Sequence, residues 1–178
     1  MRLYREGGLE TVTVSAIARD ADVSPRTFFT YFPTKEDVFL ADTEERADVL
    51  VDALRERDSG EPLLTSFGRV IRQLSATVFQ AGATSLEERR ELLRHPSIAN
   101  RLRERWDLWE QALAGAIADE LGYTADDPEP YVVAAAVIGA LRGFVAVAAR
   151  RPPAEWPALA DRAFGLLTSG LSDFGAGR

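Results

Sequence analysis

Helical periodicity constrains the fold of this chain more than any other feature of its sequence. Apolar residues recur every three to four positions along nearly all of the 178 residues, and no alternating run of β-branched residues is long enough to predict a strand. Breaks rich in Gly, Pro, Asp and Ser divide the pattern into about nine helices. The helices before Pro33 are short and those after it are long. The sequence therefore predicts an all-α protein with a small N-terminal module at residues 1–45 and a larger helical domain at residues 46–178.

Composition narrows the class of protein. The chain has no Cys, one His and 46% hydrophobic residues, which is enough to bury a core without a disulfide framework. The sequence has neither a cluster of metal-ligand residues nor a Gly-rich phosphate loop, so we expect no cofactor, no metal and no enzyme activity. Because no basic-then-apolar leader is present, a reducing cytoplasm is the expected location. The net charge of -7 argues against a generally basic surface, so any contact with DNA must be local.

Residues 13–37 predict two short helices joined by a tight connection. Thr13 or Ser15 can cap the first helix, whose apolar residues form one stripe from Val14 to Ala21. After the connection at residues 22–23, Ser24 stands at an N-cap position and Pro25 at the first helical position, where its missing N–H costs nothing. The pattern predicts a packing helix followed by a second helix that starts at Pro25.

The second helix has two different faces. Phe28, Phe29 and Phe32 fill an arc of about 100°, so we expect these three rings to anchor the helix. The opposite arc carries no carboxylate and holds Arg26, Thr27, Thr30, Tyr31 and, if the turn continues, Thr34. One arginine with several hydroxyls suits the acceptors and thymine methyls of a DNA major groove. An ordinary amphipathic surface helix would show the same two faces, so this pattern alone leaves both readings open.

A capping pattern follows at Thr34-Lys35-Glu36-Asp37 and predicts a long third helix from Lys35 to about Arg57. Lys35 is unfavourable in a first helical turn, because a helix N-terminus carries a partial positive charge. A DNA phosphate bound beside it would explain the lysine. A solvated lysine offset by Glu36 and Asp37 is the alternative.

The segments Thr13–Ala18 and Val23–Glu36, with the spacing between them, resemble the N-terminal signature of the tetracycline-repressor (TetR) family. The resemblance implies that the second short helix enters the major groove and that Arg26 and Thr27 read bases. It also implies that Tyr31 and Lys35 contact phosphates, and that Thr13 offers its hydroxyl or backbone N–H to a phosphate. The full set of expected DNA-binding residues is Thr13, Ser24, Arg26, Thr27, Thr30, Tyr31 and Lys35.

Two features depart from the family pattern. Only Met1 to Glu6 precede Gly7 and Gly8, so we expect the first helix to be truncated, with fewer basic residues near the DNA backbone. Asp22 stands where the family often has Gly. We expect only the turn to change, because Asp tolerates the left-handed backbone conformation better than most residues.

Behind this module, apolar stripes on several later helices face either each other or a cavity. Solid core is the commoner use of such stripes, but bulky side chains between bundle helices can also line an apolar ligand site. The family resemblance implies an effector pocket in this domain, and we expect an apolar or amphipathic small molecule there. The expected ligand-binding residues are Phe67, Ile71, Leu74, Val78, Trp106, Trp109, Leu113 and Phe144.

The Arg-rich stretch from Glu87 to Arg105 has two interpretations. It can be a solvated face held by ion pairs. It is also similar to TetR-type regulators that sense acyl-CoA-like ligands, since guanidinium groups suit phosphates and an apolar tunnel suits an acyl chain. His95 lies beside Pro96 at a helix break, where we expect a turn residue rather than a pH switch or metal ligand.

Residues 132–149 are apolar except for Arg142, which raises the alternative of a membrane span. The segment is Ala-rich and carries a charge near its middle, so we expect a helix buried on both sides and no membrane partner. Gly139 and Gly143 permit close approach of another helix. The family resemblance implies that the last two helices form a four-helix dimer interface, for which we expect Val137, Leu141, Val145, Trp156, Phe164, Leu167 and Leu171.

Together these patterns and the resemblance to the TetR family imply a homodimeric, sequence-specific transcriptional regulator. We expect a repressor that binds double-stranded operator DNA and is released by a small effector. The acidic charge and the short first helix leave one alternative, a helical interaction protein that no longer binds DNA. Variants of Arg26 and Lys35 would distinguish the two functions, since these substitutions should change DNA binding only if the protein is a regulator.

Overall fold

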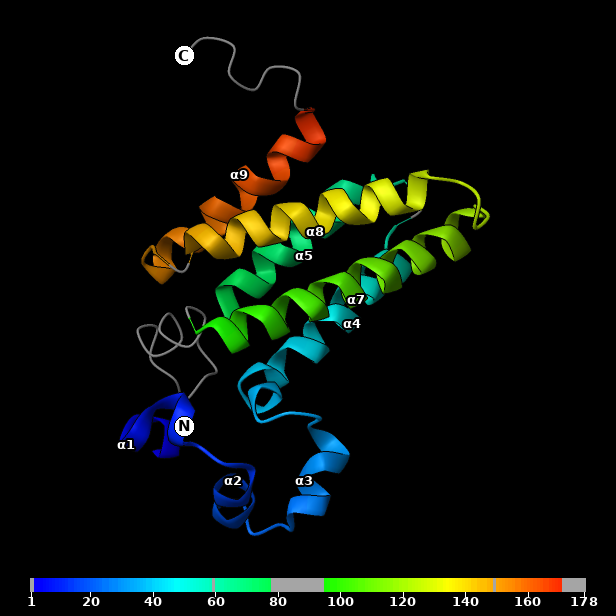
Figure 1. Cartoon of the computed structure of the whole chain (residues 1–178). Coiled ribbons are helices and arrows are strands. Elements are labelled where there is room, and N and C mark those ends of the chain that lie inside the picture. Colours follow the sequence, from blue (N-terminus) through cyan, green and yellow to red (C-terminus); the bar gives the residue numbers. More distant parts are fainter. Residues whose placement is uncertain (1, 59, 78–94, 149, 171–178) are drawn as a thin grey trace. The chain divides into compact units, whose positions relative to one another are not determined.

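The computed structural model describes residues 2–58, 60–77, 95–148 and 150–170 (Figure 1). Within these ranges the chain forms eight α-helices and two 3-10 helices, and no strand. The prediction of an all-α fold is confirmed. The chain divides into two compact units, of which the first comprises residues 1–44 and 83–104 and the second residues 45–82 and 105–178. The boundary expected at residue 45 stays a prediction, and the described residues 95–104 of the first unit lie beyond it.

The first unit contains α1 (Arg2–Thr11), α2 (Val14–Asp20), α3 (Pro25–Tyr31) and the 3-10 helix η1 (Glu36–Thr43). The first turns of α7 (Pro96–Leu121) complete it. Its core brings together Leu9 of α1, Leu40 of η1 and Ile98 of α7, with Tyr4, Phe39 and Leu102 packed around them. Because these residues come from three segments far apart in sequence, the small N-terminal helices depend on the start of α7 for their core.

The break predicted at the two glycines of the first helix appears as a kink. Gly8 has a φ of 75° and a ψ of 169°, a conformation outside the helical range that side chains with a Cβ rarely adopt. The hydroxyl of Thr11 donates to the carbonyl oxygen of Gly8 at 3.1 Å. Glycine at this position lets α1 change direction within ten residues.

The long helix predicted from Lys35 to Arg57 is wrong in its first part. Residues 36–43 form η1, and α4 (Glu44–Arg55) begins only afterwards. The predicted capping pattern is present, since the Asp37 carboxylate accepts from the backbone N–H of Thr34 at 2.9 Å. A capping pattern marks where a helix starts, but it does not distinguish an α-helix from the tighter 3-10 form that often occurs at helix ends.

The second unit contains nearly all of α4, α5 (Leu63–Thr77), the rest of α7, α8 (Glu129–Ala148), the 3-10 helix η2 (Pro153–Glu155) and α9 (Trp156–Ser169). Helix α9 packs against both α5 and α8 (Figure 1). A Cβ atom at Gly68 of α5 would lie 3.2 Å from the Cβ of Phe164, so the glycine lets α5 and α9 approach closely. Trp156 is completely buried, and its indole N–H donates to the carbonyl oxygens of Ala148 and Arg151 at 3.0 and 3.1 Å.

Helix α8 is long and apolar enough to cross a membrane, the one such helix in the described part of the chain. However, seven of its residues, among them Ala134, Val137 and Ile138, are buried within the second unit. Arg142 near its middle pairs with Asp107 of α7 at 2.9 Å and lies over the ring of Trp106, 5.3 Å from the ring centroid. We therefore interpret α8 as a core helix with one uncovered face.

Candidate DNA-binding site

The turn between α2 and α3 is built by local contacts that the sequence predicts. Thr13 is the N-cap of α2, and its hydroxyl oxygen accepts from the backbone N–H of Ala16 at 3.2 Å. Asp22 has a φ of 53°, the left-handed conformation expected at this position. The N–H of Val23 then bonds back to the carbonyl oxygen of Ala18 at 2.9 Å. These bonds fix the direction in which α3 leaves the turn.

The first turn of α3 is closed by hydroxyl groups. Ser24 is its N-cap, with its hydroxyl oxygen accepting from the backbone N–H of Thr27 at 3.0 Å and lying 2.8 Å from the Thr27 hydroxyl. The hydroxyl of Thr30 donates to the carbonyl oxygen of Arg26 at 3.1 Å. The helix start is therefore well satisfied, although α3 is only seven residues long.

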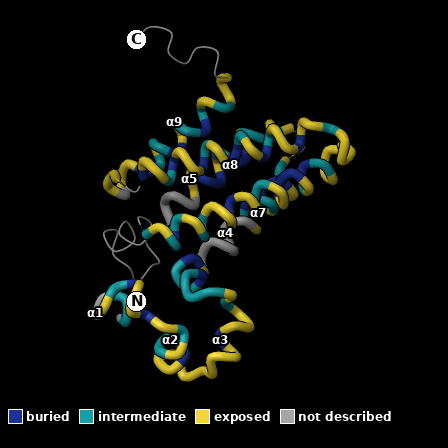
Figure 2. The backbone as a smooth tube through the Cα atoms, in the orientation of Figure 1, coloured by how far each residue is buried: buried dark blue, intermediate teal, exposed yellow. Residues whose placement is uncertain are grey.

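The outward face of α3 is exposed and carries no acid. Most of α3 is coloured as exposed (Figure 2). Arg26, Thr27 and Thr30 are among its exposed residues, and Tyr31 is 73% exposed. The guanidinium group of Arg26 makes no hydrogen bond or ion pair with any described residue. An unpaired guanidinium beside hydroxyl groups can donate two parallel bonds to the O6 and N7 atoms of guanine.

The anchoring of α3 differs from the prediction. Phe28 is buried and packs against Phe32 with ring centroids 5.5 Å apart, as expected. Phe29, in contrast, has 54% of its side chain exposed, and the prediction that it anchors the helix is wrong. The side chain of Phe29 points about 100° around the helix axis from that of Phe28, toward the face that carries Arg26. Sequence reasoning placed the three rings in one arc of about 100°, but only the part of that arc with Phe28 and Phe32 faces the core.

Lys35 binds two backbone carbonyl groups that the sequence did not suggest as partners. Its ammonium group donates to the carbonyl oxygens of Leu9 and Val12, at 2.9 and 3.0 Å, where α1 ends. A cation is favourable at the C-terminus of a helix, so this contact explains the lysine without an anion. One of its three donors stays available, and the phosphate contact of Lys35 stays a prediction.

Most of the expected ligand-binding residues lie inside the second unit. Phe67, Ile71, Trp106, Leu113 and Phe144 are buried, and Trp109 is half-buried and stacks on Trp106 with centroids 6.2 Å apart. Val78 and the side chain of Leu74 lie outside the described residues. Both a solid core and a closed pocket wall would show such burial, so the role of this set stays a prediction.

The second unit also has a crevice with apolar walls, which was not predicted from the sequence. It has a volume of about 370 Å³ and lies where α5 and α8 begin and where α7 and α9 end. Leu64, Ile117, Leu121 and Val133 supply apolar walls, and the side chain of Glu129 also lines it. Tyr123, just after α7, is 40% exposed there. Residues from four separate elements meet in this crevice, and no local pattern predicts such a meeting.

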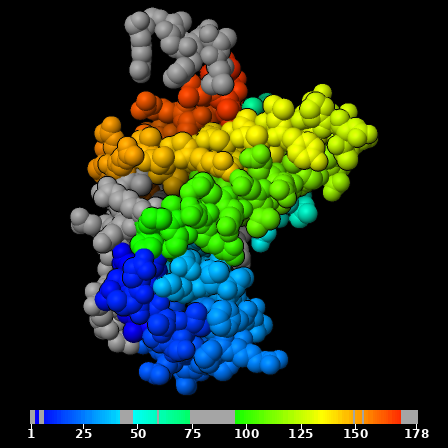
Figure 3. Space-filling model, viewed as in Figure 1, coloured from blue at the N-terminus to red at the C-terminus, as the bar shows by residue number. Residues whose placement is uncertain are grey.

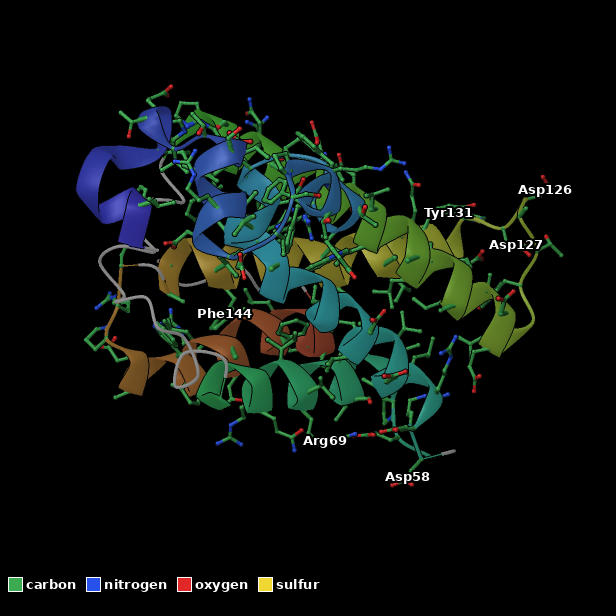
Figure 4. The ribbon with its side chains drawn as sticks, turned by 90° about the horizontal axis from the view of Figure 1, so that it is seen from below. Asp58, Arg69, Asp126, Asp127, Tyr131 and Phe144 are labelled. Carbon is green, nitrogen blue, oxygen red and sulfur yellow. The ribbon has the colours of Figure 1, made fainter. Side chains whose placement is uncertain are left out.

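Burial within the protomer divides the expected dimer residues into two groups, and the interface itself stays a prediction. Val137, Leu141, Trp156 and Phe164 are buried within the protomer and can contribute little area to an interface with another chain. Phe144 of α8, which was expected to bind ligand, has its side chain on the side of α8 that faces α5 (Figure 4). It also lines the groove between α8 and α9. Val145 and Leu167 are half-buried, and Leu171 lies outside the described residues. A helix that is apolar on all sides does not reveal from sequence which side faces its own core.

The uncovered face of α8 carries different residues. Tyr131, Val132 and Val147 are 53%, 65% and 44% exposed, and Tyr131 stands at the outer side of the first turns of α8 (Figure 4). A Cβ atom at Gly139 or Gly143 would have no neighbour within 4 Å. Helices α8 and α9 lie side by side on one face of the second unit (Figure 3), with a groove of about 550 Å³ between them. Exposed valines and open glycines on one helix suit close packing of a further helix.

The chain is similar to known regulators over both of its parts. Residues 1–41 match the family described as bacterial regulatory proteins, tetR family, and residues 61–172 match the TetR-type domain described as MftR C-terminal domain. The chain is 30% identical over 133 residues to the HTH-type transcriptional regulator TcmR of Streptomyces glaucescens, which is 71% of this chain and 59% of that protein. It thus spans less than two thirds of the length of this curated relative. These matches confirm the family resemblance, and the chain belongs to the TetR family of bacterial regulatory proteins.

Proposed function

We propose that the protein is a sequence-specific transcriptional repressor that acts in the cytoplasm and reads double-stranded operator DNA with α3. The observation that carries this proposal is the exposed face of α3, where an unpaired Arg26 stands among hydroxyl groups with no acid on the helix. Phe29 joins the expected contacts as an exposed ring that can meet a sugar or a thymine methyl. Thr13, Ser24, Thr27, Thr30, Tyr31 and Lys35 are proposed to complete the DNA interface.

Selection of bound duplexes from random DNA tests this function, and Arg26→Ala tests the reading residue. We expect the wild-type protein to select a two-fold symmetric site. We expect Arg26→Ala to lower the preference for that site over unrelated duplex by about 10- to 100-fold, because a bidentate contact to guanine is lost. Binding isotherms on both duplexes at one salt concentration measure this ratio. Arg55→Ala, on an exposed position of α4, is the control and should leave the ratio unchanged.

The proposed active form is a homodimer in which α8 and α9 of two chains pack together. The exposed valines of α8, the open glycines and Leu166 of α9, which is 39% exposed, supply the apolar surface for it. A two-fold dimer presents two copies of α3, which matches the symmetry expected of the operator.

We propose an apolar or amphipathic effector for the second unit, and an acyl-CoA-like thioester is the class to test first. Of the arginines expected to hold its phosphates, Arg101 is engaged with Asp37 and Arg103 bonds to Asn100. We therefore do not propose these two arginines as phosphate ligands. Arg105 is buried, and the other arginines of the stretch lie outside the described residues.

Release of operator DNA tests the effector class. We expect decanoyl-CoA to weaken operator binding about 5- to 150-fold, because an effector shifts the equilibrium by its preference for the form that does not bind DNA. Competition assays measured by fluorescence anisotropy give this factor. Free CoA and decanoate, each at the same concentration, separate the contribution of the CoA phosphates from that of the acyl chain. If all three compounds leave operator affinity unchanged, the effector belongs to another class.

A further inference from the structure

A buried carboxylate holds the segment that follows α3. Asp37 is completely buried and lies six residues after the last residue of α3. Its Oδ2 atom accepts from the backbone N–H of Thr34 at 2.9 Å and from the Thr34 hydroxyl at 2.8 Å. These bonds close the turn through which the chain leaves α3. Lys35, within the same turn, is bonded to the end of α1.

Arg101 of α7 completes the surroundings of this carboxylate. Its Nε donates to Oδ1 of Asp37 at 2.8 Å and its Nη2 to Oδ2 at 3.2 Å, so the contact is bidentate. Its Nη1 donates to Glu104 of the same helix at 2.6 Å. The hydrogen bonds that Arg101 donates to Asp37 and Glu104 raise its pKa above the usual value for an arginine. A planar guanidinium bonded at both edges allows little rotation of its partner.

Stability alone is a weak reason for such a pair. Asp37 is completely buried and Arg101 is 30% exposed. Removing the Asp37 charge from water costs free energy that its attraction to Arg101 offsets, so the pair is weak evidence of net stability. The geometry fixed here is the position of the turn after α3 relative to α7. Helix α7 belongs to both units, since residues up to Glu104 lie in the first unit and residues from Arg105 onward in the second. Trp106 and Trp109 lie on α7 one to two turns after Arg101.

We propose that Arg101 is a positioning residue for DNA recognition. Arg101 ties the turn after α3 to α7 and thereby links operator binding to the state of α7. This inference rests on the proposed function. The pair has two consequences that a purely stabilising contact would not have. Loss of Arg101 should weaken operator binding although Arg101 is not among the residues proposed to touch DNA, and operator binding should alter the surroundings of the tryptophans on α7. By linkage, anything that moves α7 would then change operator affinity.

The test uses the full chain, the duplex chosen by selection, and three variants. Arg101→Met removes the guanidinium and keeps much of the side-chain length, while Arg101→Lys keeps the charge but not the bidentate contact. Arg103→Met is the matched control, because Arg103 lies on the same helix, is exposed and bonds to Asn100 one turn earlier. Protein labelled with 5-fluorotryptophan gives separate ¹⁹F NMR resonances for Trp106, Trp109 and Trp156, which single Trp→Phe variants assign.

We expect the Trp106 resonance to shift when operator DNA is added to the wild type and to Arg103→Met. In Arg101→Met the shift should disappear and operator affinity should fall about 10-fold, a factor within the usual range of coupling between sites. Arg101→Lys should recover part of both. Unfolding by urea shows that each variant is folded at the temperature of the measurement. If Arg101→Met does not fold, Arg101→Lys decides the question, since a merely structural role predicts wild-type affinity and a wild-type shift for any folded variant.

The outcomes separate this inference from the proposed function. If the wild type binds operator and both Arg101 variants behave like Arg103→Met, the positioning role is overturned while the regulator stands. If the wild type selects no duplex, the proposed function fails and the role of Arg101 fails with it. Equal shifts of Trp106 in all four proteins would also overturn the link between α3 and α7.

Discussion

Gly143→Arg is expected to convert the proposed dimer to a monomer and to weaken operator binding by about 100- to 10,000-fold, the range over which linking two binding modules raises affinity. Gly143 is exposed on α8, and a Cβ atom there has no neighbour within 4 Å, so the protomer can accept the larger residue. The substitution should even favour the helix by about 0.5–1 kcal/mol, because glycine is a poor helix former. At an interface between two copies of α8, however, the arginine would occupy the space through which the helices approach.

Light scattering coupled to size-exclusion chromatography measures the mass, and anisotropy titration with operator DNA measures the affinity. Gly115→Arg is the matched control, since Gly115 is an exposed glycine of α7 whose Cβ position is equally open. We expect this control to remain dimeric with wild-type affinity. A dimeric Gly143→Arg protein that binds operator normally would place the dimer interface on another surface.

Trp156→Ala is expected to lower the free energy of unfolding by about 3–5 kcal/mol, the cost of removing a large aromatic side chain from a packed core. Trp156 is completely buried at the first position of α9, and its N–H holds two carbonyl oxygens in the segment that joins α8 to α9. Its loss would leave a cavity and remove the indole donor from both carbonyl groups, although Ala148 would keep its bond from the backbone N–H of Arg151. Urea unfolding followed by far-UV circular dichroism measures the change.

Trp156→Phe separates these two contributions. It keeps most of the ring and removes the N–H, so we expect a smaller loss of about 1–3 kcal/mol from the two indole hydrogen bonds. Leu108→Ala is a suitable control, because Leu108 is 62% exposed on α7 and its truncation should cost less than about 0.5 kcal/mol. If Trp156→Ala and Leu108→Ala had equal effects, the packing described for α9 would be incorrect.

Local features of the candidate site could be predicted from the sequence. The N-caps Thr13 and Ser24, the proline at the start of α3 and the left-handed Asp22 all depend on interactions within four residues, which short patterns encode. The helical class of the fold follows in the same way from periodicity. The matching N-terminal signature also led to the family, because it combines these local features at fixed spacing.

Features that depend on distant residues could not be predicted. The partners of Lys35 lie 23 and 26 residues earlier in the chain, and the partner of Asp37 lies 64 residues later. Nothing in the local sequence distinguishes a lysine that binds a phosphate from one that caps another helix. On α8, both faces are apolar, so the assignment of Val137 to the core and of Val132 to the surface requires knowledge of which helices cover it.

The hydroxyl of Thr30 has a consequence for the base sequence of each operator half-site. Its proton is committed to the carbonyl oxygen of Arg26 within the helix, so outward it can offer only oxygen lone pairs and a methyl group. Guanine presents only acceptors in the major groove, whereas adenine and cytosine present amino groups and thymine presents a methyl group. Under the proposed function, a guanine contact would fall to Arg26, and the neighbouring position read by Thr30 would favour adenine, cytosine or thymine over guanine.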